Sequence, residues 1–63
     1  MTYFKVYYID LVFGYSAYVY LAAYFVQPTE TCRNFIFYNE DDEIVGSIHE
    51  DWVAAIERLE DGQ

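Results

Sequence analysis

The chain offers few side chains of the kinds that enzymes use. It has one cysteine, Cys32, and one histidine, His49, beside one Lys and two Arg. A Cys–His nucleophile pair needs the two groups within hydrogen-bond reach and a third group to orient the base, and nothing in the spacing places these two together. A structural zinc site needs four ligands. We therefore expect no enzymatic activity, no cofactor and no designed metal site.

Carboxylates are the abundant chemical group. The chain has 11 Asp and Glu against three Lys and Arg, for a formal net charge of −8 in 63 residues. Residues 28–63 hold ten of the acids and two Arg, whereas residues 1–27 are balanced. Such a field repels nucleic acid and anionic membrane surfaces, and it attracts basic protein surfaces. The alternative is that the acidity only keeps an aromatic-rich small protein soluble.

The acids fall into two groups that differ in the element expected to carry them. One is a run in a predicted hairpin turn, and the other follows the exposed face of a predicted C-terminal helix, where Glu50, Glu57 and Asp61 fall within about 40° of one another. A line of carboxylates on a rigid support can imitate the spaced phosphates of nucleic acid; the alternative is an ordinary solvated surface. The expected partner-binding acids are Glu40, Asp41, Asp42, Glu43, Glu50, Asp51, Glu57, Glu60 and Asp61.

Four strands are predicted from runs of β-branched and aromatic residues. A turn at Phe13-Gly14 would join the first two, Pro28 ends the second, and the turn at residues 39–42 joins the last two, since Asn and Asp tolerate turn backbones. The predicted strands are Thr2–Val12, Tyr15–Val26, Asn34–Tyr38 and Glu43–Ile48.

A helix is predicted after the strands. Its apolar stripe has the i, i+3, i+4, i+7 spacing of one helix face and consists of Trp52, Ala55, Ile56 and Leu59. Ser47 and Glu50 fit a capping box that would begin the helix near Ile48, and Gly62 suits a C-terminal cap. Acids in the first turn favour the positive end of the helix dipole.

These elements predict a single α+β domain over residues 1–63, with an antiparallel sheet of about four strands and one C-terminal amphipathic helix packed on one face. The face under the helix should carry Phe4, Val6, Tyr8, Val19, Leu21, Phe25, Phe35, Phe37, Ile44 and Ile48. The opposite face should carry Lys5 with Tyr3, Tyr7, Tyr18, Tyr20, Tyr24 and Tyr38. Tyr is enriched at interfaces, so these six are the expected partner or homodimer face; the alternative is that Tyr pairs only stabilise the sheet.

One segment raises the question of a membrane. Residues 11–27 carry no charge, but a spanning helix needs about 20 apolar residues and this stretch is shorter and Tyr-rich. A protein anchored by Leu11–Val26 stays an alternative. The start, Met1–Lys5, lacks the pattern of a signal peptide, and a single Cys fits a reducing compartment. We expect a cytoplasmic protein.

In size and charge the chain resembles small phage-encoded anti-defence proteins, especially anti-CRISPR proteins that act as DNA mimics. The residues that carry the resemblance are the runs Glu40–Glu43, Glu50-Asp51, Glu57 and Glu60-Asp61. The resemblance implies an inhibitor that occludes the DNA groove of a CRISPR effector or another nuclease, in the cytoplasm of a host cell. The alternative function is a small adaptor or dimerisation module that uses the Tyr-rich face.

Overall fold

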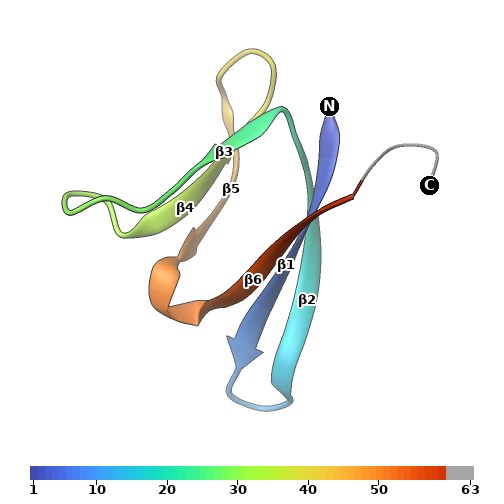
Figure 1. The fold of residues 1–63 in the computed structure, drawn as a ribbon, viewed down its shortest axis with the longest axis vertical. Helices are drawn as coiled ribbons and strands as arrows, with labels where there is room; N and C mark the ends of the chain where they lie inside the picture. The colour runs from blue at the N-terminus through green and yellow to red at the C-terminus, as the bar shows by residue number, and fades with distance from the viewer. Residues whose placement is uncertain (60–63) are drawn as a thin grey trace.

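The protein is an all-β domain of two three-stranded antiparallel sheets, with one short 3₁₀ turn and no other helix in residues 1–59, which a computed structural model describes (Figure 1). The elements are β1 (Thr2–Asp10), β2 (Gly14–Ala22), β3 (Tyr24–Val26), β4 (Asn34–Tyr38), β5 (Ile44–His49), the 3₁₀ turn η1 (Glu50–Trp52) and β6 (Val53–Leu59). The expected α+β fold is therefore wrong. The strands predicted from composition are present, with the second one divided at Ala23.

The first sheet has the order β2-β1-β6 and the second sheet has the order β3-β4-β5. The chain passes from the first sheet to the second where β2 ends and β3 begins, and it returns through η1 into β6, which pairs with β1. Figure 1 shows the two sheets side by side, with β6 lying along β1. The sheets are thus connected at both ends of the second sheet.

The predicted faces of β2 are reversed because the β1–β2 turn is one residue longer than expected. A two-residue turn at Phe13-Gly14 would place Val19 and Leu21 beside the core. Instead Asp10 pairs with Gly14, so Phe4 lies opposite Tyr20 and Val6 opposite Tyr18. A shift of one residue moves a whole strand's side chains to the other face. Tyr18 and Tyr20 therefore share the inner face with Phe4 and Val6, whereas Val19 and Leu21 point outward.

The predicted C-terminal helix is a strand with a β-bulge, and its predicted apolar stripe is divided between two faces. Ala55 and Leu59 lie on the outward face of the first sheet, and Ile56 lies on the inner face. Tyr7 pairs with Ala55 and Tyr8 with Val53, so Ala54 is an extra residue in β6. A bulge turns residues on either side of it to one face, and Val53 and Ile56 both pack against the core. Trp52 lies outside the strand, in η1, and is 53% exposed.

The capping signals also have a different outcome. Ser47 lies inside β5, so the predicted capping box is absent, and His49 caps the single turn η1 by accepting the Asp51 backbone N–H at its Nδ1. The acids Glu50 and Asp51 do occupy the first turn, as predicted, but of this 3₁₀ turn. The predicted cap at Gly62 lies outside the described residues.

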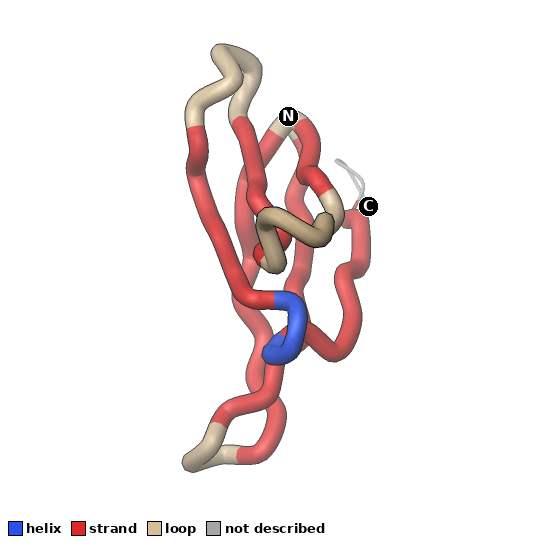
Figure 2. Tube along the Cα trace, turned by 90° about the vertical axis from the view of Figure 1, so that its left-hand side faces the viewer, coloured by secondary structure: helices blue, strands red, loops and turns tan. Residues whose placement is uncertain are grey.

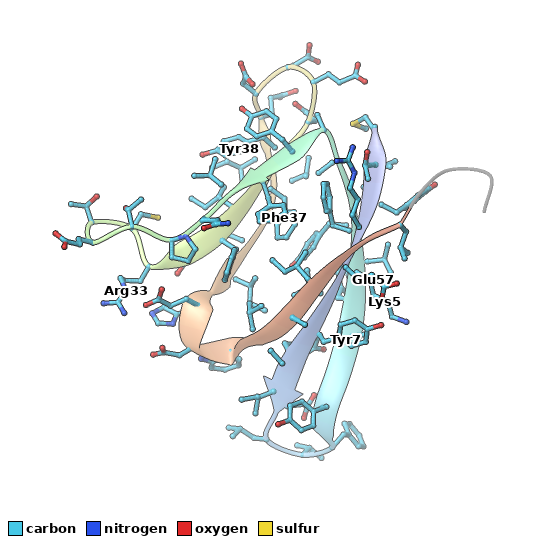
Figure 3. The ribbon with its side chains drawn as sticks, viewed as in Figure 1. Lys5, Tyr7, Arg33, Phe37, Tyr38 and Glu57 are labelled. Carbon is cyan, nitrogen blue, oxygen red and sulfur yellow. The ribbon has the colours of Figure 1, made fainter. Side chains whose placement is uncertain are left out.

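The core is aromatic and small. Within residues 1–59, four residues are buried, namely Phe4, Val6, Ala22 and Phe37. Phe37 lies where the inner faces of the two sheets meet (Figure 3), and the Tyr20 ring stacks on it with centroids 4.6 Å apart. Phe25 from β3 meets Phe4 edge-on at 5.3 Å. A domain of this size has a thin stability margin, and the core consists mostly of contacts between rings.

The molecule is flat, since its Cα atoms span 33 × 32 × 13 Å. The turn between β1 and β2 and the loop between β4 and β5 lie at opposite ends of the longest axis (Figures 1 and 2). No helix in the described part of the chain is long and apolar enough to cross a membrane. No element within residues 1–59 covers the outward face of either sheet.

Candidate interaction surfaces

The loop between β4 and β5, residues 39–43, presents the predicted run of acids and is hereafter the acidic loop. The Asn39 side-chain oxygen accepts the backbone N–H groups of Asp41 and Glu43, each at 2.9 Å. The backbone closes through Asn39 N–H to the Glu43 carbonyl at 2.9 Å, and Asp42 has φ +60°. An Asn that bonds its own turn in this way fixes the backbone. The carboxylates therefore project from an ordered turn.

The carboxylates of the acidic loop have different partners. The Tyr24 hydroxyl donates to Asp42 at 2.6 Å, and this hydrogen bond raises the pKa of Tyr24 above its ordinary value. The Asn39 side-chain amide donates to Glu43, and the Met1 ammonium lies 3.7 Å from Glu40. Asp41 is exposed, and its side chain takes part in no hydrogen bond or ion pair recorded for residues 1–59. The loop thus holds four carboxylates close together, with Asp41 the most available.

The acids of η1 lie beside an arginine. Arg33, in the loop before β4, pairs with the Glu50 carboxylate, and the Glu50 backbone N–H donates to the Arg33 carbonyl at 2.9 Å. The hydrogen bond to Glu50 raises the pKa of Arg33 above its usual range. Asp51 is exposed beside them. The charge of Glu50 is therefore largely offset, and η1 adds less negative field than its sequence suggests.

Glu57 lies on the outward face of the first sheet, opposite Lys5. Figure 3 shows it beside Lys5 and Tyr7. The Tyr7 hydroxyl donates to Glu57 at 3.0 Å, and the Lys5 ammonium lies 5.1 Å from the centre of the Tyr7 ring. Because β6 is a strand, Glu50 and Glu57 do not form the predicted carboxylate line. Glu60 and Asp61 lie outside the described residues.

The six tyrosines expected on one face are divided among three. Tyr3 and Tyr7 lie on the outward face of the first sheet. Tyr18 and Tyr20 lie on its inner side, where Tyr20 packs against the core and Tyr18 stays 57% exposed. Tyr24 and Tyr38 pair across β3 and β4 on the outward side of the second sheet, where their rings stack at 5.2 Å. A single Tyr-rich face is therefore absent, because the three-residue turn and the break at Ala23 change which side of each strand faces out.

The sequence reasoning missed two apolar surfaces. The β1–β2 turn exposes Leu11, Val12 and Phe13, with 91%, 79% and 79% of each residue accessible. The outward face of the first sheet carries two charged residues among its eleven positions, which are Tyr3, Lys5, Tyr7, Ile9, Tyr15, Ala17, Val19, Leu21, Ala55, Glu57 and Leu59. The sequence feature that could have indicated the apolar turn is the absence of charge in residues 11–27. A solvated sheet face is normally polar, and exposed apolar residues gathered in this way are typical of interaction surfaces.

The two residues with catalytic potential, Cys32 and His49, lie in neighbouring segments of the second sheet and its loop. Asn34 pairs with His49, and Cys32 lies two residues before Asn34 in an exposed loop. No hydrogen bond between the Cys32 thiol and His49 is recorded in residues 1–59, and His49 Nδ1 instead accepts a backbone N–H. No group of three His, Cys, Asp or Glu side chains in this part of the chain could hold a metal ion. This region offers no assembled nucleophile.

A groove of about 390 Å³ lies at the open seam between β3 and β6. Its walls are mainly apolar, with the Arg58 side chain at one side, and it is lined by Phe4, Ala23, Tyr24, Phe25, Ile56 and Arg58. The lining has no His, Glu or Asp, and the hydroxyl of its one tyrosine, Tyr24, is hydrogen-bonded to Asp42 of the acidic loop. The groove is therefore a gap in the closure of the two sheets.

Comparison with protein-family models, with curated proteins and with solved structures finds no match for this chain. The surfaces above are thus interpreted from the chemistry of their own side chains.

Proposed function

We propose that the protein is a non-enzymatic inhibitor that binds a basic, nucleic-acid-binding surface of another protein through the acidic loop. The observation that carries the proposal is the cluster of four consecutive carboxylates on a turn fixed by Asn39. A turn whose backbone is already ordered loses little backbone freedom on binding, and charge-assisted hydrogen bonds from Arg and Lys to carboxylates are strong. The target class is a protein groove that normally holds phosphates, such as that of a nuclease or CRISPR effector.

The distribution of cations supports the same partner. Arg33 is paired with Glu50, Lys5 lies on the outward face of the first sheet opposite Glu57, and Arg58 lies on β6. Unbalanced negative charge of this size speeds encounter with a basic surface and disfavours acidic ones. The carboxylate line on a helix plays no part in this proposal, because residues 53–59 form a strand. The contact is assigned to the acidic loop alone.

The test is affinity capture from a nuclease-treated lysate of a candidate host, followed by a salt series. We expect a retained nucleic-acid-binding protein whose affinity falls as salt rises toward 1 M, where the Debye length is about 3 Å. Asp41→Lys should weaken binding by about tenfold or more, or about 1.4 kcal/mol, by adding repulsion at the contact. Binding that is unchanged by both salt and Asp41→Lys would contradict the proposal.

Glu30→Lys is the matched control. Glu30 is exposed on the loop between β3 and β4, and its reversal changes the net charge by the same two units. If total charge alone governs binding, the two variants should lose affinity equally. A loss at least several-fold larger for Asp41→Lys assigns the contact to the acidic loop. Both substitutions lie on exposed loops, so folding, followed by circular dichroism, should be unchanged.

A further inference from the structure

The outward face of the first sheet carries fewer polar side chains than a water-exposed sheet face normally does. Four side chains of β2 point outward, and none of them is charged or has a side-chain amide. They are Tyr15, Ala17, Val19 and Leu21. Val19 and Leu21 are 44% and 42% exposed. Both lie on β2, next to the central strand β1 of the sheet. Antiparallel sheets that meet water alternate apolar and polar positions. This face therefore has the composition of a sheet that is covered.

Charge on this face is confined to one neutral pair. Lys5 and Glu57 occupy directly opposed positions on β1 and β6. None of the ion pairs in residues 1–59 includes either residue, and their polar contacts run through Tyr7. The rest of the surface is strongly acidic, so a basic partner steered by the field finds no net negative charge here. A partner surface for this face should therefore also be apolar and without net charge.

We propose that this face binds the same face of a second copy of the chain, with two reciprocal Lys5–Glu57 contacts between the copies. A two-fold axis along β1 lays β2 of one copy over β6 of the other, as in two packed sheets about 10 Å apart. Each Lys5 then reaches sideways toward Glu57 of the second copy. Such an arrangement is self-complementary, as a two-fold interface requires, and Tyr7 keeps one Glu57 oxygen hydrogen-bonded.

The available area sets the expected strength. β1 and β2 have nine residues each, so at about 3.3 Å per residue and about 4.8 Å between strands the face covers roughly 400 Å² per copy. That is at the low end for protein contacts, so the dimer should be weak and reversible. Its formation does not depend on the acidic loop, and the inference is independent of the proposed function.

The first test is sedimentation velocity of the full chain from about 10 μM to about 1 mM, a range that spans weak association. We expect a concentration-dependent dimer that Val19→Asp abolishes, because the new carboxylate lies against Glu57 of the second copy. Val26→Asp is the matched control, since Val26 is also 44% exposed but lies on β3 in the second sheet. A monomer at every concentration, or a dimer lost only with Val26→Asp, would overturn the proposal.

The second test uses the reciprocity of the charges. Lys5→Glu alone places two acids opposite each other, and Glu57→Lys alone places two amines opposite each other, so each variant should be monomeric. An equal mixture of the two should form a heterodimer, because every contact then joins opposite charges. Circular dichroism of each variant checks the fold. A mixture no more associated than its two components would overturn the assigned pairing.

Discussion

Gly46 on β5 lies directly against the ring of Tyr20 on β2. A Cβ placed on Gly46 would come within 2.3 Å of Tyr20 Cε1. Gly46 pairs with Phe37, and the Tyr20 ring stacks on Phe37, so the ring fills the space that a side chain at position 46 would take. The missing side chain thus allows β2 of the first sheet to approach β5 of the second. This contact joins the two sheets on the side opposite the β3–β6 groove.

Gly46→Ala should therefore destabilise the domain by about 1–3 kcal/mol, the usual cost of forcing extra atoms into a packed site. The measurement is urea unfolding followed by far-ultraviolet circular dichroism. In a Tyr20→Ala background the same substitution should cost much less, since neighbouring residues are coupled. A Tyr15→Ala background, at the far exposed end of β2, should leave the cost in full. Equal costs in both backgrounds would contradict the contact.

The stability of the domain should fall in strongly alkaline solution. Burial raises the pKa of Tyr20, and the hydrogen bond to Asp42 raises that of Tyr24, from an ordinary value near 10. A raised pKa in the folded state favours the protonated form, so this stabilisation is fully present below pH 10 and is lost as pH rises through the folded pKa. Tyr24→Phe should lessen the slope of unfolding free energy against pH above 10. An unchanged or steeper slope would contradict the assignment.

Asp10 should stabilise the exposed turn between β1 and β2. Its carboxylate accepts the backbone N–H groups of Val12 at 2.7 Å and Phe13 at 3.1 Å. Asp10→Ala leaves both donors without this acceptor and should cost about 1 kcal/mol, with faster amide exchange at Val12 and Phe13. Asp10→Asn keeps an acceptor oxygen and should retain most of the protection. Equal exchange in both variants would show that the side chain does not fix the turn.

The strands were predictable from the sequence, but their facing was not. Asn34–Tyr38 is observed as predicted, and the turn rich in Asn and Asp connects the strands on either side of it. The facing of β2 depends on whether the preceding turn has two or three residues. That choice rests on Asp10 accepting hydrogen bonds at its side chain and on Gly14 adopting φ +85°. Composition alone does not distinguish the two turns, and the error moved Tyr18 and Tyr20 to the wrong side.

The false helix has a similar origin. The residues at positions 52, 55, 56 and 59 have helical spacing, but of these only Ile56 packs against the core, beside Val53, whereas Ala55 and Leu59 face outward. A helix and a bulged strand both accommodate this sequence. What decides between them is the pairing of β6 with β1, a contact between opposite ends of the sequence. The acidic loop was predictable because its acids are consecutive, whereas the neutral outward sheet face depends on the register of three strands.

The most direct test of the central claim is competition between duplex DNA and this protein for its captured partner. The partner is held on the immobilised chain and challenged with a short DNA duplex at constant salt, with an uncharged polymer as the control. We expect the duplex to release the partner, and free wild-type protein to block the partner's DNA binding while Asp41→Lys does so only weakly. A partner that binds this protein and DNA at the same time would contradict the account.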